Sequence, residues 1–457
     1  MPSMPRIHSG VRPSLPAILL CCLMVALWIG GGASRLDTLG QVGVRFTATL
    51  TLMIGLLWGP RPMLAGVWAV ALLLGASILL PVLQLVPLPP ALWTALPGRD
   101  VFDGLREAGV AVPWRPLAMV PGGAVNALLS MIVPLSVFVL FGMVAPGERR
   151  WMLNLCLVLI LASMVLALVQ FSGGGFANPL INDTPGQVSG NFANRNHLAL
   201  FLAFGCLLAP FWAFGGSRIT AIRGVSGLGL LILLILLILA TGSRAGLGLG
   251  GMALAIGLGL VRGNLIRFSR RLPRWGLSVA LLGFFVIVGI AVAVSLKADR
   301  AVAINRLLDI DFGGDMRSRS LPTVLSMIDS YFPAGTGFGS FDPLFRMHEP
   351  ASLLKLTYFN HAHNDYLEIA LNAGIAGILL LIAAFGWWTI ASIRVWRVSH
   401  FAEARMGCLG SAVLFLVFAA SAFDYPARTP MIMAITVVAA MWLAWGATDA
   451  RRLSLPQ

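Results

Sequence analysis

Charged residues are scarce in this chain: Asp, Glu, Lys and Arg make up 11% of its 457 residues, whereas hydrophobic residues make up 58%. A soluble domain is not this apolar throughout, because polar side chains must cover much of its surface. Apolar runs of about 18 or more residues recur along the sequence, each long enough to cross a bilayer as a helix. The composition therefore excludes a soluble fold and predicts an all-α integral membrane protein with one polytopic domain, residues 1–457.

Cysteine is also rare, and no CxxC pair occurs. The five cysteines all lie in or at the ends of apolar segments: Cys21, Cys22, Cys156, Cys206 and Cys408. This placement is typical of small core residues, so it indicates neither a disulfide framework nor a metal cluster.

We predict about twelve transmembrane helices with both termini in the cytoplasm. The predicted spans are residues 14–33, 44–59, 63–84, 124–145, 151–170, 193–214, 225–242, 245–261, 275–296, 364–393, 406–423 and 430–447. The net charge of +14 does not indicate nucleic acid, because this topology puts all the excess on the inner tails and loops, as the positive-inside rule expects. The first apolar segment resembles a signal peptide, but more spans follow at once, so we expect it to be retained.

Three of the outer connections are long. Residues 85–123 predict a short interfacial helix, and residues 171–192 an irregular loop. The largest loop, residues 297–363, lies between the ninth and tenth spans. Within it, Leu321, Val324, Leu325 and Ile328 follow the i, i+3, i+4, i+7 pattern of an amphipathic helix lying on the membrane or on the bundle. The glycines of the following PAGTGFGSF permit tight turns and close backbone approach.

Polar residues crowd the start of the tenth span, where residues 360–374 read NHAHNDYLEIALNAG. Asp365 and Glu368 have the spacing of a helix capping box, a structural interpretation of these two acids. His361 and His363 beside Asp365 raise the alternative of a metal site. No further His or Cys stands nearby at ligand spacing, so we predict no metal. The capping box does not account for His361, His363 or Asn364, which precede the helix.

Three arginines stand at the predicted outer ends of helices, where an ion is costly unless it is paired or hydrated: Arg195, Arg244 and Arg317. Guanidinium groups bind phosphate oxygens bidentately, so several that converge on one cavity suit a diphosphate. A histidine such as His363 suits deprotonation of a hydroxyl. Structural alternatives remain, because Arg244 can cap a helix or reach lipid head groups and Arg317 can belong to the wet face of a surface helix.

Two other patterns predict structural roles. The stretch GLGLGG after Arg244 lies inside an apolar span with no preceding strand, so it predicts helix packing rather than a phosphate loop. His197 is interpreted as a polar residue at the entry of a helix.

At these residues the sequence resembles the bacterial O-antigen ligase and polymerase superfamily, over residues 185–400. The resemblance rests on GNFANRNHLALFLA, TGSRAGLGLG, MRSRSLPTVLSMIDSYFPAGTGFGSF and HAHNDYLEIALNAGIAGILLL, in this order. The family's arginine in the outer turn falls on Arg244, its loop arginine on Arg317 and its histidine on His363. Members often have tryptophan four residues after the loop arginine. Here Leu321 stands in that place, and Arg319 is a competing candidate.

The resemblance implies a cofactor-free, metal-independent, inverting glycosyltransferase of the bacterial inner membrane, with its active site facing the periplasm. It would transfer a glycan from undecaprenyl diphosphate to a hydroxyl of lipid A core, of another glycan or of a protein. The first acceptor defines an O-antigen ligase, the second a repeat-unit polymerase and the third an O-linked oligosaccharyltransferase. A secondary transporter of an anionic substrate is a different class, disfavoured because the ionisable residues gather at the outer face and not near the midplane.

The implied roles of the site residues are as follows. His363 would act as general base or would orient the acceptor. Arg244, Arg317 and Arg195 would neutralise the diphosphate as it leaves. The residues expected to position the substrate are Asn196, Asn364 and Tyr366.

Overall fold

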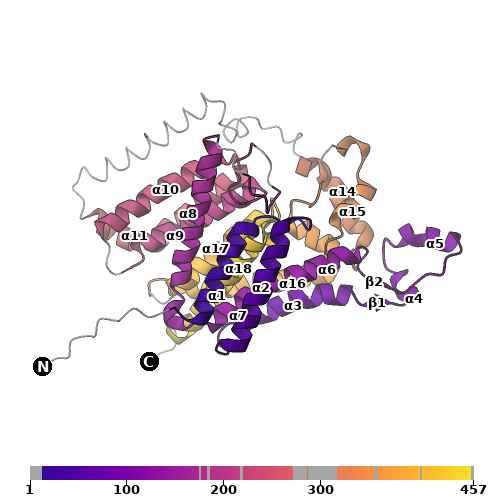
Figure 1. Cartoon of the computed structure of the whole chain (residues 1–457), viewed down its shortest axis with the longest axis horizontal. Coiled ribbons are helices and arrows are strands. Elements are labelled where there is room, and N and C mark those ends of the chain that lie inside the picture. Colours follow the sequence, from indigo (N-terminus) through magenta and orange to yellow (C-terminus); the bar gives the residue numbers. More distant parts are fainter. Residues whose placement is uncertain are drawn as a thin grey trace.

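The structure is a computed structural model that describes residues 13–173, 177–182, 186–216, 220–270, 286, 316–354, 359–401 and 404–453. About three quarters of the structure is helical and almost none of it is strand, which confirms the all-α fold class (Figure 1). The longer helices are α1 Leu15–Gly30, α2 Leu39–Trp58, α3 Trp68–Gln84, α6 Pro121–Ser130, α7 Ile132–Met143, α8 Trp151–Phe171, α9 Arg195–Phe214, α10 Ala221–Ala240, α11 Arg244–Ser269, α14 Met316–Tyr331, α15 Phe341–His348, α16 Asp365–Arg397, α17 Arg405–Ser421 and α18 Pro430–Leu453.

Every predicted span except the ninth coincides with a helix or a helix pair of the described chain. Within that part, 8 helices are long and apolar enough to cross a membrane if α6 and α7 are counted together as Pro121–Met143, while α1, α3 and α17 are shorter apolar helices. The predicted span 124–145 is interrupted at Met131, which separates α6 from α7. The ninth predicted span, residues 275–296, lies outside the described residues apart from position 286, so the number of spans stays a prediction.

The two ends of the bundle are distinguished by the chain turns that meet there. At the end that we call the Asp424 end, the start of α18 meets the end of α1, and the backbone N–H of Met431 donates to the carbonyl of Gly31 at 3.1 Å. At the opposite end, which we call the Glu148 end, the backbone N–H of Ser14 donates to Glu148 Oε1 at 3.0 Å. α9, α11, α16 and α18 all begin at the Asp424 end and run toward the Glu148 end.

Helix α9 forms the centre of the bundle, because its sequence is apolar on all sides and neighbours cover it all round. Of the 18-residue apolar window of α9 that could cross a membrane, 89% is buried inside the protein. Helix α11 packs beside it in the same direction. A Cβ added at Gly246 would lie 2.4 Å from Cβ of Ala199, and one at Gly257 would lie 3.0 Å from the carbonyl oxygen of Leu207. The glycines after Arg244 therefore serve helix packing, as predicted.

Helix α16 is broken at Gly374, whose φ of 53° and ψ of −140° are not helical. The PAGTGFG loop, residues 333–339, fills the break. The backbone N–H of Gly337 donates to the carbonyl of Asn372 at 2.9 Å, and that of Ile375 donates to the carbonyl of Pro333 at 3.0 Å. The loop glycines thus allow the close backbone approach predicted from the sequence, and the loop supplies partners for backbone groups that the break leaves free.

Helix α14 exists as predicted, but its packed face differs from the predicted one. The side chains that pack inward are Ser320, Val324, Met327 and Tyr331. Leu321 and Leu325, expected on the apolar contact face, are 41% and 48% exposed. The packed face is therefore rotated, because the aromatic residues of α15 and the loop after it pack against Val324 and Tyr331. The two leucines remain on the outer side of the helix.

Residues 85–123, predicted to hold a short interfacial helix, form several short elements, two of them helices. Strands β1 Pro87–Leu88 and β2 Arg115–Pro116 pair antiparallel, with Pro87 opposite Pro116 and Leu88 opposite Arg115. Between them lie α4 Pro90–Trp93, a 3-10 turn at Asp100–Phe102 and α5 Asp103–Glu107. This segment projects from the bundle on the side of α14 and α15 (Figure 1).

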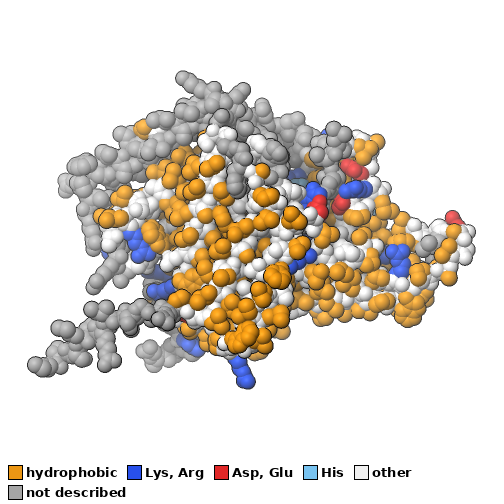
Figure 2. All heavy atoms as spheres, in the orientation of Figure 1, with side chains coloured by type: hydrophobic (Ala, Val, Ile, Leu, Met, Phe, Trp, Pro, Cys, Tyr) orange, Lys and Arg blue, Asp and Glu red, His pale blue; other side chains and the backbone are white. Residues whose placement is uncertain are grey.

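The outer surface fits a membrane environment. Figure 2 shows hydrophobic side chains over most of the visible flank of the bundle, and its few acidic side chains gather toward α14 and α15 and at the tip of α5. A flank covered by apolar side chains can lie in lipid, whereas the acidic groups require water or partners. On this face the acidic side chains thus lie away from the apolar flank, whereas Lys and Arg side chains also appear at its lower edge.

Candidate functional site

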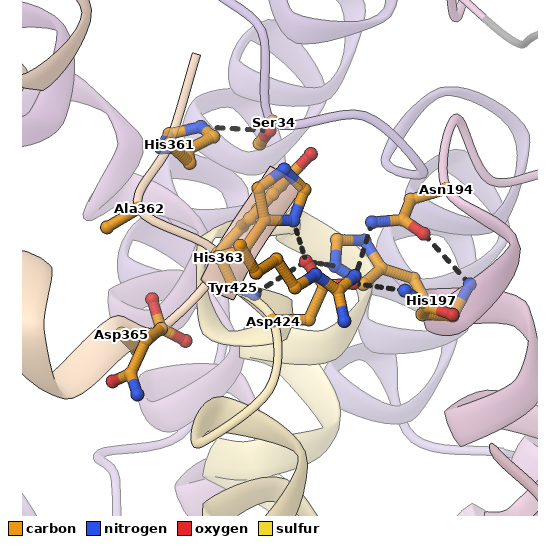
Figure 3. Close-up of polar contacts among 12 residues, drawn as sticks. Ser34, Asn194, His197, His361, Ala362, His363, Asp365, Asp424 and Tyr425 are labelled. Atoms are coloured by element: carbon orange, nitrogen blue, oxygen red, sulfur yellow. Dashed lines mark hydrogen bonds and ion pairs between the residues drawn. The ribbon is translucent and has the colours of Figure 1, made fainter. Parts of the chain in front are cut away.

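One buried carboxylate organises the Asp424 end. Asp424 lies in the turn between α17 and α18, and its side chain is 6% exposed. It accepts hydrogen bonds from Nδ1 of His363 at 3.0 Å, from Nδ2 of Asn194 at 3.0 Å and from Nδ2 of Asn196 at 2.6 Å. Arg317 Nη2 lies 3.4 Å from Oδ2 of the same carboxylate. Segments far apart in sequence therefore meet at this one group (Figure 3).

The surroundings of Asp424 keep it ionised. Burial on its own would raise the pKa of its carboxyl. The hydrogen bond from His363 and the charged or chargeable side chains around the carboxyl, Arg317 among them, outweigh that effect and hold the pKa well below its ordinary value. An ionised carboxylate can only accept hydrogen bonds, so Nδ1 of His363 carries the proton of their shared bond. Nε2 of a neutral His363 is then left as an acceptor.

The position of His363 is fixed by its backbone and by its neighbours. Its φ of 50° makes it the one non-glycine residue of the described chain with a positive φ. The next residue, Asn364, is the N-cap of α16, and its side chain accepts from the backbone N–H groups of Tyr366 and Leu367. Such left-handed residues concentrate at functional sites, where the surrounding structure holds them in place.

Tyr425 lies among three histidines. Its ring centroid is 4.2 Å from that of His361, 4.9 Å from that of His363 and 5.1 Å from that of His197 (Figure 3). His197, predicted as a helix-entry residue, is buried, and its Nδ1 lies 2.9 Å from the Thr429 hydroxyl. The aromatic ring therefore fills the space between the imidazoles and limits their rotation.

A second ionic cluster supports the start of α16. Arg428 Nε donates to Oδ1 of Asp365 at 3.1 Å, and its Nη1 lies 3.2 Å from Oε1 of Glu368. Glu368 also contacts Nδ1 of His361 at 3.0 Å and accepts from the backbone N–H of Ala362 at 3.0 Å. Burial would lower the pKa of Arg428, but the two carboxylates raise it, so the guanidinium stays charged.

The capping-box interpretation is therefore wrong. The cap of α16 is Asn364, while Asp365 is already inside the helix and binds Arg428 and the hydroxyl of Ser421. The acid at the first position is used for a buried ion pair with the α17–α18 turn, a long-range contact that spacing within one helix does not reveal.

The predicted arginines lie at the same end of the bundle. Arg195 is the first residue of α9, between the two asparagines that bind Asp424. Arg244 is the exposed first residue of α11, and the contact between Gly246 and Ala199 places it beside the first turn of α9. Arg317, at the start of α14, contacts Asp424.

The competing Arg319 points elsewhere. Its Nη2 donates to the carbonyl of Ser352 at 2.6 Å, on the exposed side of the loop. The structure thus puts Arg317, and not its neighbour two residues later, against the carboxylate that binds His363.

The predicted substrate-positioning residues also have structural partners. Asn196 binds Asp424, and the side-chain N–H of Asn364 donates to the carbonyl of Ala422 at 3.0 Å. The hydroxyl of Tyr366 donates to the carbonyl of Phe418 at 2.6 Å. Asn364 and Tyr366 therefore tie α16 to α17, and a role toward substrate stays a prediction for both.

Sequence reasoning missed Asp424, Tyr425 and Arg428. They lie in FDYPARTP, residues 423–430, which is a short connection between two predicted apolar spans. The sequence did contain a signal for these residues, because an acid, an aromatic residue and a base stand together in a turn that links two buried helices.

The histidines and carboxylates of this site are also possible metal ligands. Within the described ranges, no group of three or more His, Cys, Asp or Glu side chains is arranged to hold a metal ion. His363 and His361 bind different carboxylates, Asp424 and Glu368, and do not converge on one point. Metal independence stays a prediction about the reaction.

Comparison with known proteins agrees with the sequence. Residues 229–382 match the family model described as O-Antigen ligase, which confirms the resemblance to the O-antigen ligase and polymerase superfamily. The matched range contains Arg244, Arg317 and His363, whereas Arg195 and Asp424 lie outside it. No curated protein matches the chain. The match and the apolar helices support a multi-pass membrane enzyme of lipopolysaccharide or other polysaccharide biosynthesis.

Proposed function

We propose that this protein transfers a glycan from undecaprenyl diphosphate to an acceptor hydroxyl, with inversion at the anomeric carbon. The observation that carries the proposal is the hydrogen bond between His363 Nδ1 and Asp424, because it leaves Nε2 as a base with a fixed orientation. Arg317 lies against the same carboxylate, so a permanently charged guanidinium stands beside this base.

The reaction needs a base and an anion site close together. In our proposal Nε2 of His363 takes the proton of the acceptor hydroxyl, and the hydroxyl oxygen forms a bond to the anomeric carbon. The bond from that carbon to the diphosphate oxygen breaks, and the lipid diphosphate leaves with the electron pair. Arg317, Arg195 and Arg244 stabilise the negative charge that develops on it.

Asp424 would act as a positioning residue. It fixes the tautomer of His363 and stabilises the imidazolium that forms when the proton arrives, as a buried carboxylate does for other catalytic histidines. The buried charge of Asp424 also offsets that of Arg317, so the empty site tolerates the arginine until a diphosphate binds.

The placement of these groups favours transfer over secondary transport. They lie at one end of the helices, where α9, α16 and α18 begin, whereas transporters place ionisable residues near the bilayer midplane between repeats. With the excess positive charge in the cytoplasm, the Asp424 end would face the periplasm, and the donor would reach it from the outer leaflet of the inner membrane.

The test is glycan analysis in cells that lack the protein. Glycan chains that are complete on the lipid carrier but absent from lipid A core would identify a ligase, and single repeat units on the carrier a polymerase. Unmodified glycoproteins would identify a protein acceptor.

Re-expressed wild-type protein and the His400→Ala variant should restore the glycan, because His400 is exposed and its ring contacts its sequence neighbour Phe401, away from the site. His363→Ala should not, although it should reach the membrane in equal amount. Full restoration by His363→Ala would contradict the proposal.

A further inference from the structure

A polar cavity lies at the Glu148 end of the bundle, away from the site just described. Its volume is about 630 Å³, and it opens between the ends of α8, α9, α10, α17 and α18. Its lining, as far as the described residues go, holds four arginines and a single acid, Asp449, so it is strongly cationic; these arginines are Arg149, Arg150, Arg223 and Arg405.

Several buried donors in this wall have no partner. Among the described residues, Nε of Arg223, Nε of Arg405 and Nε1 of Trp442 are buried without a hydrogen bond. Trp442 is only 3% exposed, so water does not reach most of its side chain. Buried N–H groups without acceptors are rare in native proteins, and each one requires an explanation such as a bound ion or ligand.

Two acids of the described chain lie near the cavity, Glu148 and Asp449, and neither supplies the missing acceptors. Glu148, next to Arg149, binds the hydroxyl and the backbone N–H of Ser14. Asp449 lies 3.9 Å from Arg452, on the following turn of α18. Among the residues that the structure describes, the cationic lining is therefore left without an equal negative charge.

Tryptophans orient two of the guanidinium groups. The Arg149 guanidinium lies 3.5 Å from the centroid of the Trp445 ring, and that of Arg223 lies 4.9 Å from the Trp212 ring. Stacking on an aromatic face leaves the N–H edges of a guanidinium available to an anion. Arginine and tryptophan together are also typical of helix ends that lie at the depth of the lipid head groups.

We propose that this cavity binds a phosphate-bearing anion. Phosphate offers oxygens to several N–H donors at once and carries the negative charge that the lining lacks. Such an anion has two sources, the head group of an anionic lipid or a soluble phosphate compound, and basic pockets between transmembrane helices do bind phospholipid head groups. The fifteen-residue rise from Pro430 to Trp445 along α18 separates this site from Asp424 by roughly 22 Å.

Binding to purified protein tests the proposal without any glycan assay. In one arm, phosphatidylglycerol is added to the protein in detergent and retained lipid is counted by native mass spectrometry, with phosphatidylcholine as the neutral reference. In the other arm, inorganic phosphate is titrated in a calorimeter. The Arg223→Gln/Arg405→Gln variant should bind whichever probe the wild-type protein binds about tenfold more weakly, as expected for the loss of charged hydrogen-bond donors.

Two further variants decide the outcome. Trp442→Phe removes one buried donor with little change in shape, so it replaces the double variant if that one fails to fold, and it should also weaken binding. Arg397→Gln removes an exposed cation from the same end that does not line the cavity, and it should bind like wild type. An effect confined to phosphatidylglycerol identifies a lipid head group, and saturable phosphate binding a soluble ligand. No binding of either probe, or an equal loss in Arg397→Gln, overturns the proposal.

Discussion

At the scale of single residues, Asp424 has the largest expected effect. Replacing it by Asn keeps the shape but removes the charge that fixes the tautomer of His363 and balances Arg317. We expect Asp424→Asn to lower the transfer rate by on the order of 10²–10⁴, the usual contribution of a positioned general base. The rate is measured in proteoliposomes that contain the lipid-linked donor. Asp342→Asn, which breaks an exposed pair with Arg346, is the matched control, and an equal loss there would contradict the assignment.

The same carboxyl gives stability a pH dependence. Its pKa in the folded protein lies below the value of about 3.9 for an unfolded chain. Its contribution to stability is therefore fully present above that value and is lost progressively as the pH falls below it toward the folded pKa. We expect the Tm of wild type in detergent to fall more steeply than that of Asp424→Asn between about pH 5 and pH 3. Parallel curves would show that the carboxylate does not stabilise the fold.

Individual residues also show what the sequence could predict. His363 and Arg317 were identified because a base and a cation stand beside apolar helices, where an ion needs a reason. Asp424 was missed because its partners lie in three segments distant in sequence, and no local spacing reports such a meeting. The roles of Asp365 and Glu368 were misread for the same reason, since their partner Arg428 comes from a different turn.

At the scale of elements, the break in α16 offers a sharp test. A Cβ at Gly374 would lie 1.9 Å from the carbonyl oxygen of Pro333, and the φ of 53° disfavours any other residue. We expect Gly374→Ala to destabilise the protein by at least about 1–3 kcal/mol and to lower its Tm. Gly386→Ala, in the same helix, is the control, because a Cβ there meets nothing within 4 Å. Equal Tm values for the two variants would argue against a role of the loop in holding the break.

Element boundaries were predicted better than element faces. The start of α16 and the existence of α14 follow from capping residues and apolar periodicity, which act locally. The rotation of α14 could not be predicted, because Val324 and Tyr331 were selected by the aromatic residues of α15 that they meet. The same holds for the break in α16, since its backbone partners come from the glycine loop.

At the scale of the whole molecule, the orientation in the membrane is open to direct measurement. We expect Ser330→Cys, exposed at the Asp424 end, to react with a membrane-impermeant maleimide in cells with a permeabilised outer membrane. Arg397→Cys, exposed at the opposite end, should react only after the inner membrane is lysed. The unsubstituted protein measures the background from its five cysteines. The reverse pattern would place the candidate site in the cytoplasm.

The overall architecture was the easiest property to predict, because hydropathy and charge asymmetry act on the whole chain. Hydropathy and charge asymmetry do not show how the helices pack. They therefore do not predict that the α17–α18 turn contacts the loop before α16. That arrangement follows from close contacts such as that of Gly246 with Ala199, which depend on the three-dimensional fit of distant segments.

The shared carboxylate has a final consequence for the energetics of the site. Asn194, Asn196, Arg317 and His363 all bind the side chain of Asp424, so their contributions are coupled through one partner. In a double-mutant cycle, the second substitution among them should cost much less than it does alone. The α9 start, the α14 start and the histidine loop should then respond as a single thermodynamic unit.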